Sequence, residues 1–305
     1  MLFRSAVTFD KNATAVVQNG PTVTATGADW TVYNLDVEAG GSVVMGTTDL
    51  EHYGTALTNN NSFTIGTGAV TFRNPGAVTL GGSGTYDLYD LTANNADVTL
   101  TSSLLRIRRT LDMTNGGTFN ANNTGNPARV LELHSDANGT GRIGPMSAGP
   151  SFTGQVDMER YVPGGVTNWR LISAPTNNNQ LSSLEDDFVT AGYPGSEFPL
   201  FDDPPGSNIL WPSIRTYDET DGGAALIDGL TGATGDNMVM AMGQGFAAWS
   251  GTGLLTTSPF TIDLRSGVRN ALTPLNLPVS YTNTGNATVD GWNLVGNPLP
   301  SPIDF

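Results

Sequence analysis

The chain has 305 residues, of which 38% are hydrophobic and only 13% are charged, and its formal net charge is −15. This length has room for two domains with a sizeable core. The acidic excess with a single lysine, Lys11, excludes the basic face that nucleic acid or an anionic membrane surface requires, and the absence of cysteine excludes disulfides and thiolate chemistry.

The two ends of the chain indicate a piece of a longer protein. The apolar stretch within residues 1–11 is too short for a signal peptide, and no apolar run reaches the length of a membrane helix. At the other end, "GWNLVGNPLPSPIDF" builds a proline-rich turn and then stops. We therefore expect no membrane insertion, a signal sequence outside this piece, and further sequence downstream.

Residues 1–150 consist of short alternating segments separated by Gly, Asn or Pro. Inward-facing pairs recur with near-constant spacing, as in Phe63/Ile65, Val70/Phe72 and Val78/Leu80. Such spacing without helical periodicity predicts a β-solenoid with coils of about 20 to 25 residues, each buried by stacking on its neighbours. An antiparallel sandwich with hairpins is the alternative.

Charged residues of this region suggest two kinds of chemistry. Asp87, Asp90 and Asp97 are the carboxylates that a polysaccharide-cleaving solenoid would need in one cleft. Arg106 and Arg108 flank Ile107 and project from one outer face with Arg109 beside them. We expect these arginines to pair with acids on neighbouring coils, and the alternative is contact with an anionic glycan.

The segment "HSDANGTG" offers a candidate metal loop. Asp136, Asn138 and Thr140 alternate as oxygen donors around glycines, a spacing that could begin a Ca²⁺ site. The adjacent His134, Ser135 and Asp136 cannot form a catalytic triad, because triad groups converge from separate segments. A glycine-rich turn is the simpler interpretation, and Asp218, Glu219 and Asp221 form a similar acidic loop.

Residues 151–305 have longer strand-like pieces with tryptophan and long Pro/Gly/Asp loops, which predict an antiparallel β-sandwich-like domain that continues downstream. Leu181, Leu184 and Phe188 have helical spacing. "WRLISAP" at 169–175 and "WNLVGNP" at 292–298 share Trp, Leu and Pro at equal offsets. We expect two equivalent strands, with Trp169 and Trp292 both largely buried.

Four motifs in order resemble a known group of proteins. They are "LHSDANGTGRIGP" at 133–145, "GQVDMERYVPGGVTNWRLISAPT" at 154–176, "MGQGFAAW" at 242–249 and "DGWNLVGNPLPSPIDF" at 290–305. The chain resembles large exported or cell-surface proteins of Bacteroidetes that use type IX secretion, with Leu299 where Tyr is common. The motif residues that carry the resemblance are Trp169, Arg170, Pro175, Gly245, Trp292, Asn293, Gly296, Asn297 and Pro298.

The resemblance implies an extracellular or cell-surface location and a modular architecture, without a reaction. We expect a non-enzymatic structural or adhesive module that self-associates or binds other modules of the same protein, and that can build a fibre or matrix. The alternatives are a carbohydrate-binding module for an extracellular glycan, marked by exposed aromatics in a row on one sheet, and a polysaccharide-degrading enzyme. No cofactor is expected apart from the candidate Ca²⁺.

Overall fold

The computed structural model describes residues 10–20, 22–113, 115–146, 151–221, 223, 225–253, 255–268, 275–277 and 279–301. The predicted N-terminal strand segment from Ala6 and the final "PIDF" therefore lie partly or wholly outside the described residues. The chain forms two compact units, which divide between Glu159 and Arg160. None of the helices in the described part of the chain has the length and apolar character needed to cross a membrane.

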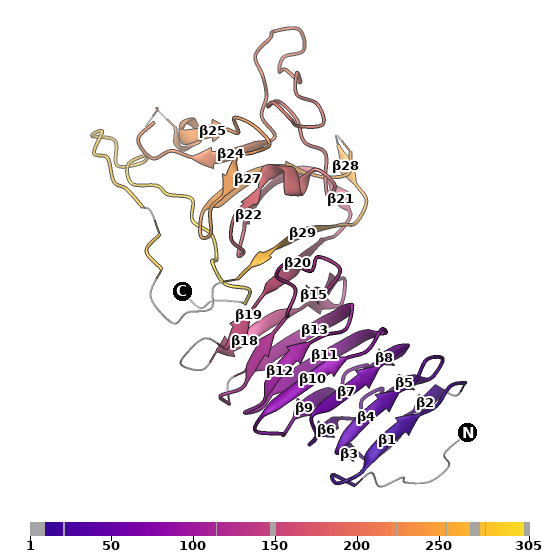
Figure 1. Cartoon of the computed structure of the whole chain (residues 1–305). Helices are drawn as coiled ribbons and strands as arrows, with labels where there is room; N and C mark the ends of the chain where they lie inside the picture. The colour runs from indigo at the N-terminus through magenta and orange to yellow at the C-terminus, as the bar shows by residue number, and fades with distance from the viewer. Residues whose placement is uncertain are drawn as a thin grey trace. The chain divides into compact units, whose positions relative to one another are not determined.

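The first unit is a β-solenoid with parallel strands on three sides (Figure 1). One side has the spatial order β1 (Thr14–Val17), β4 (Asn34–Val37), β7 (Ala56–Asn59), β10 (Ala77–Gly81), β12 (Asp97–Leu100), β14 (Thr118–Asn120) and β19 (Phe152–Thr153). The second has the order β2 (Thr22–Thr24), β5 (Ser42–Val44), β8 (Ser62–Thr64), β11 (Thr85–Ala93), β13 (Leu104–Met113), β15 (Val130–Leu133) and β20 (Gln155–Val162).

The third side begins with β3 (Trp30–Val32), β6 (Leu50–His52) and β9 (Ala69–Phe72). It continues through the second halves of β11 and β13 to β18 (Arg142–Met146). Register gives the coil length directly: Thr14 pairs with Asn34, Leu35 with Leu57, and Leu57 with Leu80. The predicted solenoid and its coil length are confirmed.

Alternating residues fill the solenoid interior because successive side chains of a strand point to opposite faces. The six residues predicted to be inward are all at most 1% exposed: Phe63, Ile65, Val70, Phe72, Val78 and Leu80. Polar turns are satisfied locally, as at the buried Asn59, whose amide donates to the Thr85 carbonyl at 2.8 Å and accepts from the Asn61 N–H at 3.0 Å. Stacking of the coils thus buries the apolar side chains and also provides hydrogen-bond partners for the buried polar side chains at the turns.

The last coil carries a small projection. A short antiparallel pair, β16 (Ser135–Asp136) and β17 (Gly139–Thr140), follows β15. The chain then continues to β18 and β19, where Phe119 and Phe152 stack at 6.2 Å with almost parallel rings. This insertion places His134 and Asp136 beside the outer face of β13.

The second unit consists of small antiparallel sheets. Its main sheet has the order β22 (Asn168–Ser173), β27 (Gly245–Ser250), β24 (Ile214–Tyr217) and β25 (Leu230–Gly232). Two-stranded pairs join β21 (Gly165–Val166) to β28 (Thr256–Thr257) and β23 (Asn179–Gln180) to β26 (Val239–Met240). The all-β prediction is confirmed, and the region predicted as sandwich-like takes this form.

One face of the main sheet covers the core of the second unit. Ile214, Phe246 and Ala248 contribute from the sheet, and Ile262 and Leu264 contribute from β29 (Phe260–Gly267). Two 3₁₀ helices, η1 (Leu181–Leu184) and η2 (Leu226–Gly229), complete the elements. The predicted helical segment is thus a single 3₁₀ turn, whose Leu181 and Leu184 are buried as expected.

Candidate functional site

The outer face of the main sheet carries a groove of exposed apolar side chains, called here the aromatic groove. Strand alternation turns Ile172 of β22 toward the core, and it turns Trp169 and Leu171 outward. Leu171 is 73% exposed, an unusual value for a leucine in the middle of a strand. The groove has a volume of about 420 Å³ and is lined by Trp169, Leu171, Arg215, Tyr217, Leu226, Ile227, Leu230, Ala247, Trp292, Asn293 and Leu294.

Three tryptophans from separate segments meet on this face. The ring centroids of Trp169 lie 5.5 Å from Trp211 and 5.7 Å from Trp249, and Trp211 lies 5.9 Å from Trp249. The Arg215 guanidinium lies 5.1 Å from the Trp169 ring and 5.8 Å from the Trp211 ring. Burial lowers the pKa of Arg215. Cation–π contacts of this kind fix the orientation of the indole rings.

The other wall of the groove comes from the segment that contains Trp292. The Gly245 N–H donates to the Leu294 carbonyl at 3.0 Å, and Val295 bridges Gln244. A Cβ atom at Gly245 would lie 2.7 Å from the Leu294 Cγ, so glycine is required for this close approach. The "GQGF" motif therefore makes room for the second tryptophan motif.

The Glu219 side chain binds the segment that contains Trp292, although the sequence suggested only that Glu219 belongs to an acidic loop. Its buried carboxylate accepts the N–H of Thr282 and of Gly291, the latter at 3.1 Å, and the hydroxyls of Ser280 and Thr282 at 3.0 Å each. Burial opposes ionisation, but these donors lower the pKa of Glu219. One carboxylate thus holds three points of the chain.

The expected equivalence of the two tryptophan motifs is wrong. Trp169 lies in a strand and is 36% exposed, whereas Trp292 lies outside any strand and is 52% exposed. Both side chains line a surface groove instead of a core. The reason is that the core-facing positions of β22 belong to the alternate residues, which leaves the tryptophan on the outer side.

The remaining motif residues have structural contacts. Arg170 donates to the carbonyls of Ser250 and Val166, and so ties the ends of β22 and β27 together. Asn293 donates to the Ser280 carbonyl at 2.8 Å, and Asn297 donates to the Ser301 carbonyl at 2.6 Å. Of the other motif residues, Gly296 packs on Ser173, Pro298 lies near Gly243, and Pro175 is half-buried two residues after β22.

A network of ion pairs covers the outer face of β11, β13 and β15. Parallel register places Asp87 beside Arg106, and Arg106 beside Glu132. Arg106 Nε donates to Glu132 Oε1 at 2.5 Å, while Arg108 holds both oxygens of Asp87 at 2.6 and 2.8 Å. The prediction that these arginines pair with acids on neighbouring coils is confirmed.

The same contacts account for the acids considered for an enzyme. Asp87 is bound by Arg108, and Asp90 is bound by Arg109, whose Nε donates at 2.8 Å. Asp97 lies on a different side of the solenoid, where it accepts from the Thr118 hydroxyl at 2.7 Å. The structure does not bring the three carboxylates together in one cleft.

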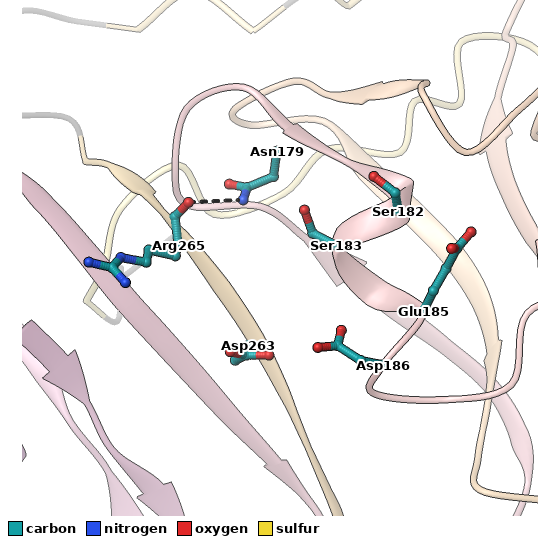
Figure 2. Close-up of a pocket in the computed structure, with 7 residues that line it drawn as sticks. All are labelled: Asn179, Ser182, Ser183, Glu185, Asp186, Asp263 and Arg265. Atoms are coloured by element: carbon teal, nitrogen blue, oxygen red, sulfur yellow. Dashed lines mark hydrogen bonds between the residues drawn. The ribbon is translucent and has the colours of Figure 1, made fainter. Parts of the chain in front are cut away.

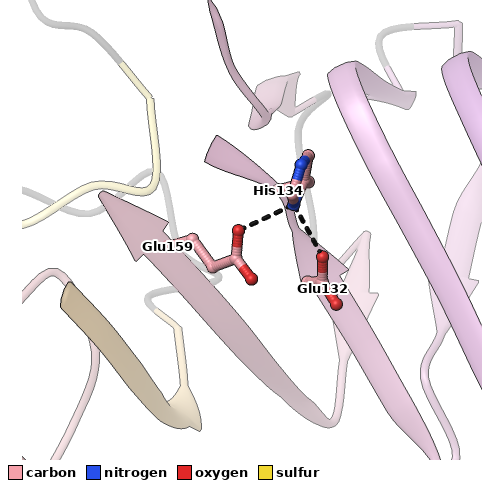
Figure 3. A group of neighbouring side chains, drawn as sticks. All are labelled: Glu132, His134 and Glu159. Atoms are coloured by element: carbon pink, nitrogen blue, oxygen red, sulfur yellow. Dashed lines mark hydrogen bonds and ion pairs between the residues drawn. The ribbon is translucent and has the colours of Figure 1, made fainter. Parts of the chain in front are cut away.

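His134 lies at the end of this network, between two glutamates (Figure 3). Its Nδ1 atom is 2.9 Å from Glu132 Oε1 and 2.8 Å from Glu159 Oε2. Glu159 comes from the next coil, on β20, and the Ser135 N–H donates to its Oε2 at 2.8 Å. Burial raises the pKa of Glu159, and the neighbouring Glu132 carboxylate adds to the shift. No sequence pattern indicated that these three side chains converge.

The candidate Ca²⁺ ligands are engaged in the hairpin itself. Asp136 Oδ1 accepts the Asn138 N–H at 2.7 Å, as in an Asx turn, and the hydroxyls of Thr140 and Ser135 are 2.7 Å apart. Asp136 Oδ2 faces Arg108 at 3.2 Å and His134 Nε2 at 3.5 Å. Asp136 thus uses Oδ1 within the turn and directs Oδ2 at Arg108 and His134.

An acidic pocket of about 500 Å³ lies beside η1 in the second unit (Figure 2). Its lining residues are Asn179, Ser182, Ser183, Glu185, Asp186, Asp263 and Arg265. Beneath them, Asp187 Oδ2 accepts the Asp263 N–H at 3.1 Å. Burial raises the pKa of Asp187 to about 8, and the carboxylates of Asp263 and Asp186 contribute to the rise.

Comparison of the chain with protein-family models, with curated proteins and with solved structures found no match in any of the three. The resemblance to exported Bacteroidetes proteins therefore supports a proposal and does not assign a family.

Proposed function

We propose that this chain is a non-enzymatic structural or adhesive module of a secreted or cell-surface bacterial protein. The four motifs in the order seen in exported Bacteroidetes proteins support the location. The solenoid supports the structural role, because apolar side chains fill its interior and the charged side chains on its outer face pair between coils. The catalytic alternative finds no support in the separated Asp87, Asp90 and Asp97.

The observation that carries the proposal is the open first coil. Within the described residues, β1, β2 and β3 each have a ladder partner on one side only. An unpaired strand edge is a template for another strand. A repeated head-to-tail contact of this edge with another copy does not close on itself and builds a filament. A contact with another module of the same protein joins the two modules.

Concentration-dependent assembly tests this proposal. Light scattering of the purified chain should show species that grow with concentration, and negative-stain microscopy should show linear particles. Contact through a specific strand edge should give particles of uniform width, whereas nonspecific aggregation should not. A chain that stays monomeric across a wide concentration range would contradict self-assembly and leave a spacer that joins only to other modules.

The aromatic groove favours a second candidate function, the binding of an extracellular glycan. Trp169 and Trp292 expose indole surface on one face of a sheet, where a sugar ring can stack by its C–H face. The nearby Arg215 guanidinium, partly covered by two indole rings, supplies donors for hydroxyl or carboxylate groups.

Oligosaccharide titration followed by tryptophan fluorescence tests the groove. Neutral and uronic-acid oligosaccharides should shift the emission saturably, and Trp169→Ala and Trp292→Ala should each abolish the response. Tyr33→Ala is the matched control, because Tyr33 is an exposed aromatic residue of the solenoid. An unchanged spectrum of the wild-type chain with every sugar would eliminate this second function.

A further inference from the structure

His134 faces carboxylates with both of its ring nitrogens. Nδ1 lies within 2.9 Å of one oxygen from Glu132 and one from Glu159, and Nε2 lies 3.5 Å from Asp136 Oδ2. A neutral imidazole has one N–H and one lone pair. With the N–H on Nε2 directed at Asp136, the Nδ1 lone pair converges with two carboxylate oxygens on one point.

This convergence has the geometry of a metal-ligand set. Bonds of roughly 2.0–2.2 Å to nitrogen and oxygen place neighbouring ligand atoms about 3 Å apart when they meet at right angles, and about 3.4 Å apart when they meet at tetrahedral angles. The two N···O distances of 2.9 and 2.8 Å match the right-angle spacing and are shorter than the tetrahedral spacing, and the three ligand atoms lie within 4.8 Å of one another. Figure 3 shows His134 between the two glutamates.

The surrounding charges favour a cation at this point. The network pairs the guanidiniums of Arg106 and Arg108 with the carboxylates of Asp87, Glu132 and Asp136. Glu159 joins it as a fourth carboxylate through His134. With a neutral imidazole, two negative charges of this network stay unmatched, which equals the charge of one divalent ion. Each carboxylate oxygen has two lone pairs, so Glu132 Oε1 can keep its bond to Arg106.

The supporting contacts fix the ligands before any ion binds. The Ser135 N–H holds Glu159 Oε2 at 2.8 Å, and Arg106 holds both oxygens of Glu132. Asp136 takes the position of the outer carboxylate that receives the second N–H of a metal-bound histidine and sets its tautomer. Asp136 is held in turn by Arg108 at 3.2 Å.

We propose that Glu132, His134 and Glu159 form a binding site for Zn²⁺, with Asp136 as the outer partner of the histidine. One imidazole and two carboxylates suit a borderline ion such as Zn²⁺ better than Ca²⁺, which prefers an all-oxygen shell. The ion would link β15 to β20, the two strands that pair through Glu132 and Asp157. The ion would therefore hold β20 against the last coil of the solenoid. This role does not depend on the proposed self-assembly or on glycan binding.

Metal titration of the full chain after removal of metal with a chelator tests the proposal. Calorimetry should show saturable binding of one Zn²⁺ per chain, a higher melting temperature with Zn²⁺, and little response to Ca²⁺ or Mg²⁺. Glu159→Gln and His134→Gln should lower Zn²⁺ affinity by more than the roughly 10–100-fold that loss of an outer partner costs, and Asp136→Asn should fall within that range.

Asp186→Asn is the matched control, because it removes one carboxylate from the other acid cluster, Asp186, Asp187 and Asp263. It should leave Zn²⁺ binding unchanged. Binding that survives in both Glu159→Gln and His134→Gln but fails in Asp186→Asn would overturn the assignment. A wild-type chain that binds no Zn²⁺ would also overturn it and would leave a histidine that lies among three carboxylates.

X-ray absorption of the wild-type Zn²⁺ complex covers the case in which a variant does not fold. The chain has two histidines and no cysteine, and the other histidine, His52, is buried in the solenoid. The spectrum should show nitrogen and oxygen scatterers with one imidazole per zinc. A first shell without imidazole would reject His134 as a ligand.

Discussion

At the scale of single residues, the stacking of coils restricts the sequence most tightly where backbones approach. A Cβ atom at Gly117 would lie 1.4 Å from the carbonyl oxygen of Ala93, one coil earlier. At Gly139, in the projecting hairpin, nothing lies within 4 Å of the same atom. Two glycines of the same unit thus differ in whether any side chain fits.

Gly117→Ala should therefore lower the free energy of unfolding by about 1–3 kcal/mol, the usual cost of an overpacked site. The added methyl group forces two coils apart and strains the ladder between β12 and β14. Urea denaturation measures the effect, and Gly139→Ala serves as control with an almost unchanged midpoint. Equal midpoints for the two variants would show that the coils at Gly117 are not packed as closely as described.

The half-buried carboxylate of Asp187 gives a pH dependence with a definite sign. Its pKa rises from 3.8 to about 8 in the folded chain because of burial and its acidic neighbours. Between these values the folded state binds the proton that the unfolded state has lost, so stability falls as pH rises from about 4 to about 8. This contribution is absent at lower pH, and the full penalty persists above pH 8.

Asp187→Asn should remove that dependence, because the amide oxygen can still accept the Asp263 N–H. The variant should match the wild type near pH 4 and exceed it at pH 8 by at least about 1.4 kcal/mol, the equivalent of one pKa unit. Chemical denaturation at several pH values measures the gap. A constant difference between the two chains across this range would contradict the shifted pKa.

The sequence alone predicted the arginines of the ion-pair network on the outer face of β11, β13 and β15. The alternation in "RIRR" placed Arg106 and Arg108 on one outer face, where acids on neighbouring coils were the expected partners. The convergence of Glu159 on His134 was not accessible, because it depends on coil register and on the length of the β16–β17 projection. The β16–β17 insertion interrupts the regular spacing of strands in the last coil. Alternation of side chains then no longer indicates which residues of neighbouring coils lie side by side.

At the scale of elements, the two tryptophan motifs show that the available strand partners, and not the local sequence pattern, decide whether a segment forms a strand. "WRLISAP" forms β22, which pairs with β27 over six residues. The opposite edge of β27 pairs with β24 through Ile214 and Arg215. Because both edges are occupied there, "WNLVGNP" can only lie against the start of β27, where Gln244 bridges Val295. Equal sequence patterns therefore gave one strand and one irregular segment.

The irregular segment has few ladder bonds, so its order should depend on Glu219. Glu219→Gln keeps one oxygen for the N–H groups of Thr282 and Gly291, but it removes the negative charge and the second acceptor, which the hydroxyls of Ser280 and Thr282 use. Hydrogen exchange in residues 279–301 should become faster, while exchange in the main sheet stays unchanged. Glu197→Gln is the control, since Glu197 is an exposed glutamate of the same unit. Unchanged exchange in both variants would show that other contacts hold the segment.

At the scale of the whole chain, the two units differ in how far sequence determines them. The solenoid repeats the same kind of coil, so alternation and spacing predict its strands, its inward residues and its coil length. In the second unit, strands from distant segments pair with each other, as β22 does with β27. No sequence repeat indicates which strands are partners. Its tryptophans suggested a core, whereas the structure places them on the outer face, because sequence alternation does not say which face is covered.

In the proposed assembly, chains join end to end through the edge of the first coil. The carbonyls of Ala13 and Val17 accept from Tyr33 and Glu38 of the second coil. In a parallel ladder the backbone groups of the intervening Thr14 and Val16 point to the opposite, open side. An incoming strand would need the Val16 N–H as a donor, whereas the first coil itself does not.

Val16→Pro removes that donor on an edge strand, where proline is tolerated. The variant should keep the thermal transition of the wild type but lose concentration-dependent growth in light scattering. Val16→Ala keeps the N–H and removes only side-chain surface, so it should still assemble. If both variants assemble like the wild type, the contact does not use the edge of β1; if both fail, the exposed valine side chain, and not the backbone, carries the contact.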